Sequence, residues 1–350
     1  MKLNINYRTL LNIINLNYGV YNPVNEFVSK RDFLSIIKNY TLANGKFFPM
    51  PIFISVSKKF YVKYKDDKII KVFYNSKKVC NLAVKTFYKL NKQYIGKRIF
   101  GTSDKKHPGF FQFLKSDEYF IHCKIINFNQ KIMKNLNFTF PKKTKLIFLK
   151  NKLKTIVGFH TRNVPHRAHE WIHNFALKKC EGLFIHPLIG QFKKKEYKEK
   201  IIIKSHLKLI KEAYKNKNVF FGLFNSYPMY GGPREALLHA IVRRNYGCTH
   251  FILGRDHAGV GKYYKKYASQ NLCLKYQKSM KIKIIAFPEP YLCSICKKVV
   301  NKRCINCKRV SKKLISGTQI RDLILKKKKI PDIFMRESLS CLLKPNSLIS

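Results

Sequence analysis

From about residue 145 to residue 286, short apolar runs alternate with longer segments of helical spacing, and this alternation is the most restrictive feature of the chain. The apolar runs have the length of buried strands, whereas the other segments repeat apolar residues as an amphipathic helix does. The runs are KLIFLK, TIVGF, GLFIHPLIG, NVFFGLF and THFILGRD, and the helical segments are RAHEWIHNFALKKC, IIIKSHLKLIKEAYKN and GGPREALLHAIVRRNYG. Such alternation is typical of a parallel sheet with helices on both faces. We therefore predict an α/β domain over residues 143–286.

The segments on either side of this domain have different patterns. Residues 1–142 are β-rich, with strands predicted in PIFISVSKKFYVKY and KIIKVFYN. Residues 287–350 contain a cysteine cluster and then LISGTQIRDLILKKKKIPDIF, which reads as a turn leading into a helix. A chain of 350 residues is long for one core. Three domains with these bounds are the expectation.

The charge of the chain is extreme. It has 71 Lys+Arg against 18 Asp+Glu, a formal net charge of +53. Selected binding of a polyanion is one explanation, and mutational bias of an AT-rich genome is the other, because Asn, Ile, Tyr and Phe are abundant too. In either case, small anions are drawn toward such a chain.

The cysteines and the apolar runs indicate where in the cell the protein is located. Six of the ten cysteines are scattered and four are clustered, unlike a secreted disulfide framework. No apolar run reaches the ~18 residues of a membrane span, and the N-terminus lacks a cleavage site after an apolar core. We expect a cytoplasmic protein with no membrane partner.

The stretch TRNVPHRAH, residues 161–169, follows a predicted strand and leads into a predicted helix. Pro165 suits a first helical turn, which places His166 and His169 on one face of it. Imidazoles and the free amides of a helix start can donate to an anion, and Arg162 adds a planar cation. The stretch therefore predicts a phosphate or sulfate site. A metal site and core packing are the alternatives, although no third metal ligand lies nearby in the sequence.

The stretch GRDHAGVG, residues 254–261, follows the last strand of the alternating region. Its glycines would let a ligand approach the backbone closely, although a plain tight turn is the alternative. Because strand ends of a parallel sheet meet at one edge, this loop and TRNVPHRAH are expected there together. In SGTQIR, Ser316 and Thr318 fit helix caps, and Arg321 lies one turn later.

Four cysteines form two C-x-x-C pairs, which are Cys293, Cys296, Cys304 and Cys307. Paired knuckles in a chain of intracellular character predict a tetrahedral zinc site. Four thiolates leave no open coordination position, so the zinc is expected to be structural.

The stretch GPREALLHAIVRRNYGCTHFILGRDHAGVG resembles the long signature of the ATP sulfurylase (sulfate adenylyltransferase) family over nearly its whole length. GFHTRNVPHRAHE is similar to the nucleotide-binding loop of that family, ISGTQIRDLI to its C-terminal segment, and the cysteine pairs to the zinc-binding insert of its bacterial branch. GVYNPVNEF and KKHPGFF resemble its N-terminal domain. The resemblance implies a PUA-like β-rich domain, a Rossmann-like nucleotidyltransferase domain with a parallel sheet, and a small C-terminal domain with a zinc knuckle.

The resemblance also implies a reaction, in which ATP and sulfate give adenylyl sulfate (APS) and pyrophosphate, with Mg²⁺ arriving with ATP. It assigns catalysis to Thr161, Arg162, Asn163, His166 and His169. It assigns ATP binding to His160, Thr161, Arg162, Asn163, Gly254, Arg255, Asp256, His257 and Ile285. It assigns sulfate binding to His160, Arg162 and Ala258. Members of the family assemble, and a homodimer is expected; the reaction can also run in reverse, in sulfur oxidation.

The chain departs from the family pattern at two positions. His160 stands where the family usually has Gln, and Val164 stands where it usually has Pro. An imidazole can still donate one N–H to sulfate, whereas Val164 presets the loop backbone less than Pro does. No Walker-type phosphate loop is present, which predicts that no APS kinase domain is fused to the chain.

Two other functions stay open from the residues. A different nucleotidyltransferase could use the two histidines on a phosphate-bearing acceptor. A basic nucleic-acid-binding protein could use its lysines and a zinc knuckle, but these lysines lack the clustered aromatic platforms on which bases stack. Nucleic acid is therefore not the expected partner.

Overall fold

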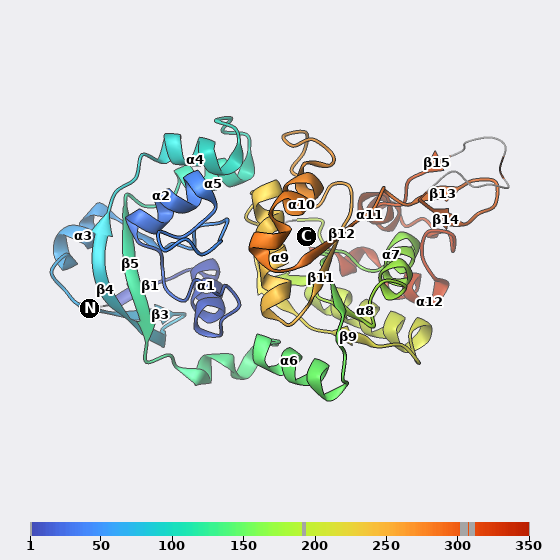
Figure 1. The fold of residues 1–350 in the computed structure, drawn as a ribbon, viewed down its shortest axis with the longest axis horizontal. Helices are drawn as coiled ribbons and strands as arrows, with labels where there is room; N and C mark the ends of the chain where they lie inside the picture. Colours follow the sequence, from blue (N-terminus) through green and yellow to red (C-terminus); the bar gives the residue numbers. More distant parts are fainter. Residues whose placement is uncertain (1, 191–193, 302–306, 308–311, 350) are drawn as a thin grey trace. The chain divides into compact units, whose positions relative to one another are not determined.

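The computed structural model describes residues 2–190, 194–301, 307 and 312–349 (Figure 1). The chain divides into two compact units by its internal contacts. Unit 1 comprises Met1–Ile147, Pro228–Gly247 and Asp256–Lys283, and unit 2 comprises Phe148–Tyr227, Cys248–Arg255 and Ile284–Ser350. The chain thus passes from one unit to the other several times. The domain bounds expected from the sequence, 1–142, 143–286 and 287–350, stay a prediction.

Unit 1 is built on a five-stranded sheet with the order β1-β3-β4-β5-β2. Its β1 pairs with β3 in parallel and the other pairs are antiparallel. The strands are β1 (Lys2–Asn4), β2 (Ser55–Val56), β3 (Ile69–Tyr74), β4 (Lys77–Tyr88) and β5 (Tyr119–Ile126). The helices are α1 (Tyr7–Asn17), α2 (Lys30–Asn39), α3 (Lys58–Tyr64), α4 (Lys92–Phe100), α5 (Pro108–Leu114), the 3-10 helix η1 (Gln130–Asn135), α9 (Pro233–Asn245) and α10 (Ala268–Met280). The β-rich character expected of the N-terminal region is confirmed.

Aromatic side chains fill the core of unit 1. Phe33 of α2 contacts Phe113 of α5 and Phe120 of β5, with ring centroids 6.3 and 5.9 Å apart, and all three rings are buried. Buried Arg234, at the start of α9, donates to the carbonyl oxygens of Ile36 and Ile37 at the end of α2. A cation suits the carbonyl end of a helix. The signature stretch thereby also ties α9 to the N-terminal region.

Unit 2 contains the predicted parallel sheet, with the order β12-β11-β6-β7-β9. The pairs β11–β6, β6–β7 and β7–β9 are parallel. The strands of this sheet are β6 (Ile156–Phe159), β7 (Gly182–Ile185), β9 (Val219–Phe221), β11 (His250–Leu253) and β12 (Lys283–Ala286). Smaller sheets are formed by β8 (Leu188–Gly190) with β10 (Phe224–Ser226), and by β13 (Tyr291–Cys293) with β14 (Val299–Val300) and β15 (Lys312–Lys313). The helices are α7 (Arg167–Leu177), α8 (Glu199–Ala213), α11 (Gly317–Leu325), α12 (Glu337–Ser340) and the 3-10 helix η2 (Pro345–Ser347), while α6 (Pro141–Lys150) leads into the unit.

Side chains of β7 show that both faces of this sheet are covered. Leu183 and Ile185 share a buried cluster with Ile172 of α7. Phe184, between them in the sequence, lies with its ring centroid 5.7 Å from that of Phe148. Since successive strand residues point to opposite faces, apolar groups from α7 and from the end of α6 cover opposite sides.

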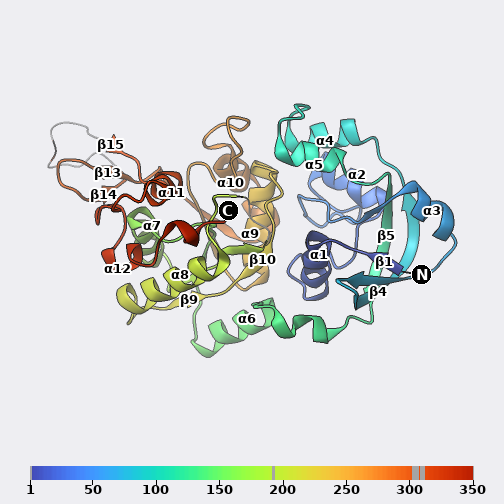
Figure 2. The same cartoon turned by 180° about the vertical axis from the view of Figure 1, so that it is seen from behind.

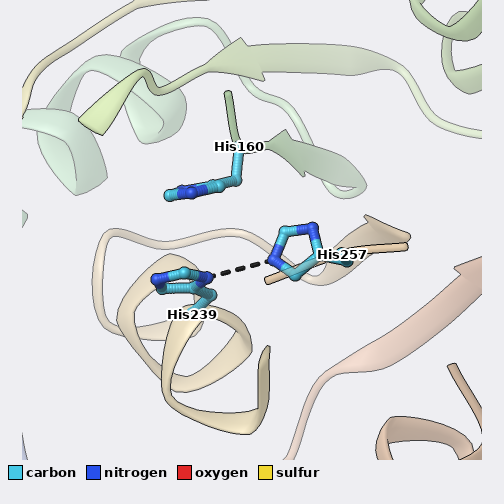
Figure 3. A group of neighbouring side chains, drawn as sticks. All are labelled: His160, His239 and His257. Atoms are coloured by element: carbon cyan, nitrogen blue, oxygen red, sulfur yellow. Dashed lines mark hydrogen bonds between the residues drawn. The ribbon is translucent and has the colours of Figure 1, made fainter. Parts of the chain in front are cut away.

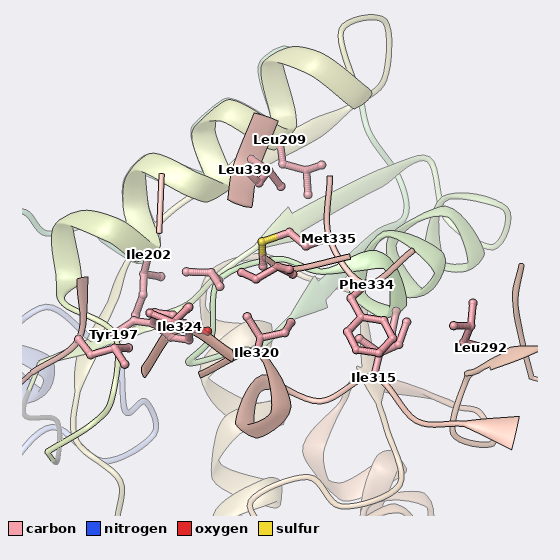
Figure 4. Packing of buried hydrophobic residues seen from close by; sticks show 14 of the residues in the cluster. Tyr197, Ile202, Leu209, Leu292, Ile315, Ile320, Ile324, Phe334, Met335 and Leu339 are labelled. Carbon is pink, nitrogen blue, oxygen red and sulfur yellow. The ribbon is translucent and has the colours of Figure 1, made fainter. Parts of the chain in front are cut away.

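The C-terminal segment packs onto α7 and α8. Ile202 and Leu209 of α8 share one buried cluster with Ile320 of α11, Met335 and Leu339 (Figure 4). The helices α8 and α12 are neighbours in both views of the chain (Figures 1 and 2). The helix predicted in LISGTQIRDLILKKKKIPDIF is α11, which begins after Ser316 in a capping box with Gln319. Lys326 follows its last residue.

Two strand predictions were wrong. KLIFLK lies in helix α6, where Leu146 and Leu149 are exposed and Phe148 is buried, so the run is not buried on two faces. The part KKFYVKY of the first predicted strand is helix α3, which Ser57 caps and which has no buried residue. An apolar run of this length does not separate strand from helix without knowledge of what it packs against.

Candidate active site at the strand ends of unit 2

The loop after β6 carries the first group of predicted site residues. All four residues of β6 are buried, and His160 to Asn163 follow its carboxyl end. The carbonyl of Thr161 accepts a hydrogen bond from Leu188 N (2.9 Å), and its hydroxyl accepts one from Asn163 N (3.1 Å). Thr161 is itself buried. The threonine therefore holds the backbone of the loop against β8.

Asn163 is held by side chains from two distant helices. His206 Nε2 of α8 donates to the Asn163 carbonyl (3.1 Å), and Arg321 Nη1 of α11 donates to Asn163 Oδ1 (2.9 Å). Arg321 Nη2 also donates to Thr318 Oγ1 (3.0 Å). A Cβ at Gly317 would lie 2.8 Å from the Asn163 side chain. The SGTQIR segment thus packs directly on this loop.

The two histidines lie at the start of α7, although not as the sequence predicted. The helix begins at Arg167 rather than near Pro165, so His166 is the N-cap residue and makes no side-chain cap bond. Arg167 N donates to the Phe334 carbonyl (2.8 Å), which uses one of the amides expected to be free at the helix start. The rings of His166 and His169 stack with centroids 3.7 Å apart. The expected side-by-side placement of the imidazoles is present.

Burial keeps these imidazoles neutral. Desolvation, with a smaller contribution from neighbouring His206, lowers the pKa of His166 to about 3. Desolvation also lowers the pKa of His206 to about 4 and holds the pKa values of His169 and His173 well below the ordinary range. Nδ1 of His166 and Nδ1 of His169 are buried and make no hydrogen bond within the described residues. Buried polar atoms of this kind are usually satisfied, so they point to a ligand.

The loop after β11 begins in the same unit. Because β11 and β6 are parallel neighbours, Gly254 and Arg255 leave the sheet at the same edge as His160 to Asn163. A Cβ at Gly254 would lie 3.6 Å from Phe287, an ordinary contact. Ile285 is on β12, the strand next to β11. Unit 2 therefore brings these predicted residues to neighbouring strand ends.

The rest of that loop belongs to unit 1. Asp256 O accepts from Gly259 N (3.2 Å), and a Cβ at Gly259 would lie 2.1 Å from Asp256 Oδ1. Ala258 adopts a left-handed conformation with φ 57°. Ser269 Oγ donates to the His257 carbonyl (2.6 Å). The tight turn that was the alternative interpretation is present, and it aligns Asp256 with the backbone of Gly259.

Four residues that contact the predicted ones were not predicted from the sequence. His239 of α9 shares a hydrogen bond with His257, Nδ1 to Nε2 at 3.0 Å (Figure 3). In unit 2, His206 donates to the Asn163 carbonyl. Glu196 lies beside Arg162, and Glu289 lies beside Arg255. No local pattern marks His206, Glu196 or Glu289, because each meets its partner only through the fold. His239 lies in ALLHAI, and a single polar residue within an apolar helical stretch could have marked it as a candidate site residue.

Three of the four predicted zinc ligands lie together. The Sγ atoms of Cys293, Cys296 and Cys307 are within 4.8 Å of one another, and Cys293 Sγ lies 3.5 Å from Cys307 Sγ. Backbone N–H groups of Cys296 and Ile295 lower the pKa of the Cys293 thiol to about 7. Cys304 lies outside the described residues. A cluster of three converging thiols is a donor set that suits a metal ion.

Among the helices that the structure describes, none is both long and apolar enough to cross a membrane.

Comparison with known proteins agrees with this geometry. The family model described as ATP-sulfurylase matches residues 137–345, and the model of a PUA-like domain matches residues 1–130. A sulfate adenylyltransferase of Carboxydothermus hydrogenoformans is 33% identical over 349 residues, which are 98% of this chain and 91% of the relative. Proteins of the same name from Chloroflexus aurantiacus and Entamoeba histolytica are each 33% identical; the matches cover 93% and 97% of this chain, and 86% and 84% of those proteins.

A solved structure titled hexameric APS kinase from Thiobacillus denitrificans has a TM-score of 0.74 and 15% sequence identity. The match covers 97% of this chain but 62% of that one, and at this identity it shows a shared fold alone. The family model, which spans more than half of the sequence, and the relatives matched over nearly its full length decide the family: the chain belongs to the ATP-sulfurylase family.

Proposed function

We propose that this protein is a sulfate adenylyltransferase, which joins ATP and sulfate to give APS and pyrophosphate. The relatives matched over nearly the whole chain carry that name. One structural observation carries the proposal: a stacked pair of neutral imidazoles, of which His166 is buried, follows Arg162 in the sequence, at a sheet edge that also presents Arg255. Such an edge suits a reaction between two anions.

The roles proposed for the residues follow the sequence analysis. Sulfate binding is assigned to Arg162, with His160 and the Ala258 backbone. Catalysis is assigned to Thr161, Arg162, Asn163, His166 and His169. ATP binding is assigned to Gly254, Arg255, Asp256, His257 and Ile285, together with His160 to Asn163. Support comes from the fixed loop backbone at Thr161 and Asn163 and from the shared sheet edge.

The chemistry requires that two mutually repelling anions be held in line, because sulfate oxygen attacks the α-phosphorus while pyrophosphate leaves. Arg162 supplies a fixed charge with fork geometry. His166 and His169 are neutral when no anion is present, and a nearby phosphate raises the pKa of an imidazole. Their positive charge would therefore develop where negative charge accumulates in the transition state. Mg²⁺ enters as part of the nucleotide substrate.

We also propose one structural zinc ion per chain, held by Cys293, Cys296, Cys304 and Cys307. The described thiols fit such an ion, and its full thiolate shell would stabilise the β13 to β15 sheet without joining the reaction. Metal analysis of protein purified without chelator should find about one zinc per chain. Cys293→Ser should remove it and lower the melting temperature, whereas Cys341→Ser, at an exposed free thiol, should do neither. A metal-free wild-type protein would exclude the zinc site.

A direct assay tests the reaction. Purified protein should release pyrophosphate from ATP only when sulfate is added. The variant Arg162→Ala should lose this sulfate-dependent release. Release that requires a phosphate-bearing acceptor instead would favour a different nucleotidyltransferase. Salt-sensitive binding of RNA or DNA that survives replacement of Arg162 and His166 would favour a nucleic-acid-binding protein. Running the assay from APS and pyrophosphate measures the reverse direction.

The setting of the enzyme is also a proposal. A cytoplasmic homodimer is the expectation from the sequence, and the scattered cysteines support an intracellular location. Light scattering of the purified protein measures the assembly state, and fractionation of cells measures the location.

A further inference from the structure

Both arginines at the strand ends of unit 2 lie beside a carboxylate. Arg162 Nη1 is 3.7 Å from Glu196 Oε1, and Arg255 Nη1 is 2.9 Å from Glu289 Oε2. The four side chains retain between 22% and 38% of their exposure. Each pair is therefore accessible to ions from solution.

The two pairs differ in how tightly the arginine is held. Arg255 and Glu289 are within hydrogen-bond length, as are Arg336 and Glu170 at 2.8 Å. The distance of 3.7 Å between Arg162 and Glu196 exceeds that of a hydrogen bond, so Coulomb attraction alone joins them. An ion pair of this kind, half in water, is weak and can be replaced.

The backbone that carries Glu196 is held by the C-terminal segment. The Glu196 carbonyl accepts from Ile349 N (2.8 Å), and Lys195 N donates to the Ile349 carbonyl (2.7 Å). The next residue, Tyr197, is fully buried and bridges to Leu348. Contacts with Leu348 and Ile349 thus hold the main chain in place and keep Glu196 beside Arg162.

We propose that Glu196 determines sulfate affinity by acting as the internal counter-ion of Arg162, which sulfate must displace. The inference rests on the proposed function and names the residue that tunes its acceptor site. Sulfate is a dianion and is repelled by a carboxylate nearby, so Glu196 weakens its binding. In a chain of net charge +53, which attracts anions in general, this counter-ion keeps non-substrate anions from occupying Arg162.

The test measures sulfate binding by titration calorimetry on full-length variants at constant ionic strength. Glu196→Gln should bind sulfate about 3- to 10-fold more tightly, because one negative charge near the bound dianion is gone. Glu289→Gln removes the matched charge beside Arg255 and should leave sulfate affinity within about twofold. Glu212→Gln makes the same change in net charge near the far end of α8, about 20 Å from the first residue of that helix, and therefore serves as the control. In an Arg162→Ala background, Glu196→Gln should give no gain.

Several outcomes would overturn the inference. These are an unchanged or weaker sulfate affinity in Glu196→Gln, an equal gain in Glu212→Gln, and no measurable sulfate binding by any variant. Pyrophosphate release by the wild type is measured in parallel, which separates the two proposals. Tighter binding without turnover removes the proposed function alone, whereas normal turnover with an unchanged affinity removes the role of Glu196 alone.

Discussion

The loop after β6 and the loop after β11 both place an arginine beside a carboxylate, but they are held in place differently. Asn163, in the first, is held by His206 and Arg321, which are 43 and 158 residues away. Asp256, in the second, closes a turn with Gly259, and His257 is bonded to Ser269, only 12 residues away. The first loop therefore depends on tertiary packing, whereas the second is largely a local turn. Substitutions in the two loops should differ accordingly.

The largest effect is expected at the first loop, in His166→Ala. Removing the imidazole that we propose to stabilise transition-state charge should lower the rate of pyrophosphate release about 10²- to 10⁴-fold. His166→Asn, which fills more of the buried space, should be similarly inactive and should retain the wild-type circular dichroism. Activity near that of the wild type in either variant would show that His166 has no catalytic role.

The histidines behind the first loop should also make folding sensitive to acid. The pKa values of His166 and His206 in the folded state, about 3 and about 4, lie below the ordinary value near 6.5. Stability is then complete above about pH 6.5 and falls as the pH drops toward the folded-state values, because the unfolded chain binds protons first. Each histidine should lower the free energy of unfolding by about 1.6 kcal/mol between pH 6.5 and pH 5. Urea unfolding at both pH values measures this, and His206→Asn should reduce the difference; an unfolding free energy equal at both pH values would contradict it.

Arg321→Ala tests whether long-range support of Asn163 matters for catalysis. Loss of the Arg321 guanidinium, which donates to Asn163, should displace the loop and lower turnover about 10- to 100-fold. Arg321→Lys should be intermediate, because an ammonium lacks the planar pair of donors. The exposed Arg31 of α2 serves as the control, and Arg31→Ala should keep full turnover. If Arg321→Ala is as active as that control, the first loop does not need its distant contacts.

The smallest effect is expected in the second loop, from two glycines compared with each other. A Cβ at Gly259 collides with Asp256, whereas a Cβ at Gly254 meets Phe287 at 3.6 Å. Gly259→Ala should therefore distort the turn and raise the KM for ATP about 3- to 10-fold, with a small fall in melting temperature. Gly254→Ala should keep the melting temperature, so a rise in its KM would report contact with the nucleotide. Equal melting temperatures for the two variants and the wild type would show that the turn is not constrained at Gly259.

The elements confirmed best are those whose sequence pattern is long. The helices α7, α8 and α9 lie where periodicity predicted them, because 11 to 15 residues of helical spacing outweigh local ambiguity. The strands β6, β7, β9 and β11 also lie in predicted runs, whereas β12 was not predicted. The strand prediction for KLIFLK was wrong because its six residues fit a strand as well as a helix. Only the packing of Phe148 against Phe184 decides which side chains are buried. The start of α7 was placed too early because Val164 is buried in a core cluster that includes residues of the C-terminal segment.

The residues proposed to bind anions, the two strand-end loops and the cysteine pairs were determined by the sequence itself, since they depend on short spacing and on the order of strands and helices. The tertiary structure alone decided which distant side chains hold those loops: Arg321 and His206 on Asn163, His239 on His257, and Glu196 beside Arg162. The physical reason is distance along the chain. Contacts within a turn follow from local backbone geometry, whereas pairs separated by many residues exist only after helices and strands have packed.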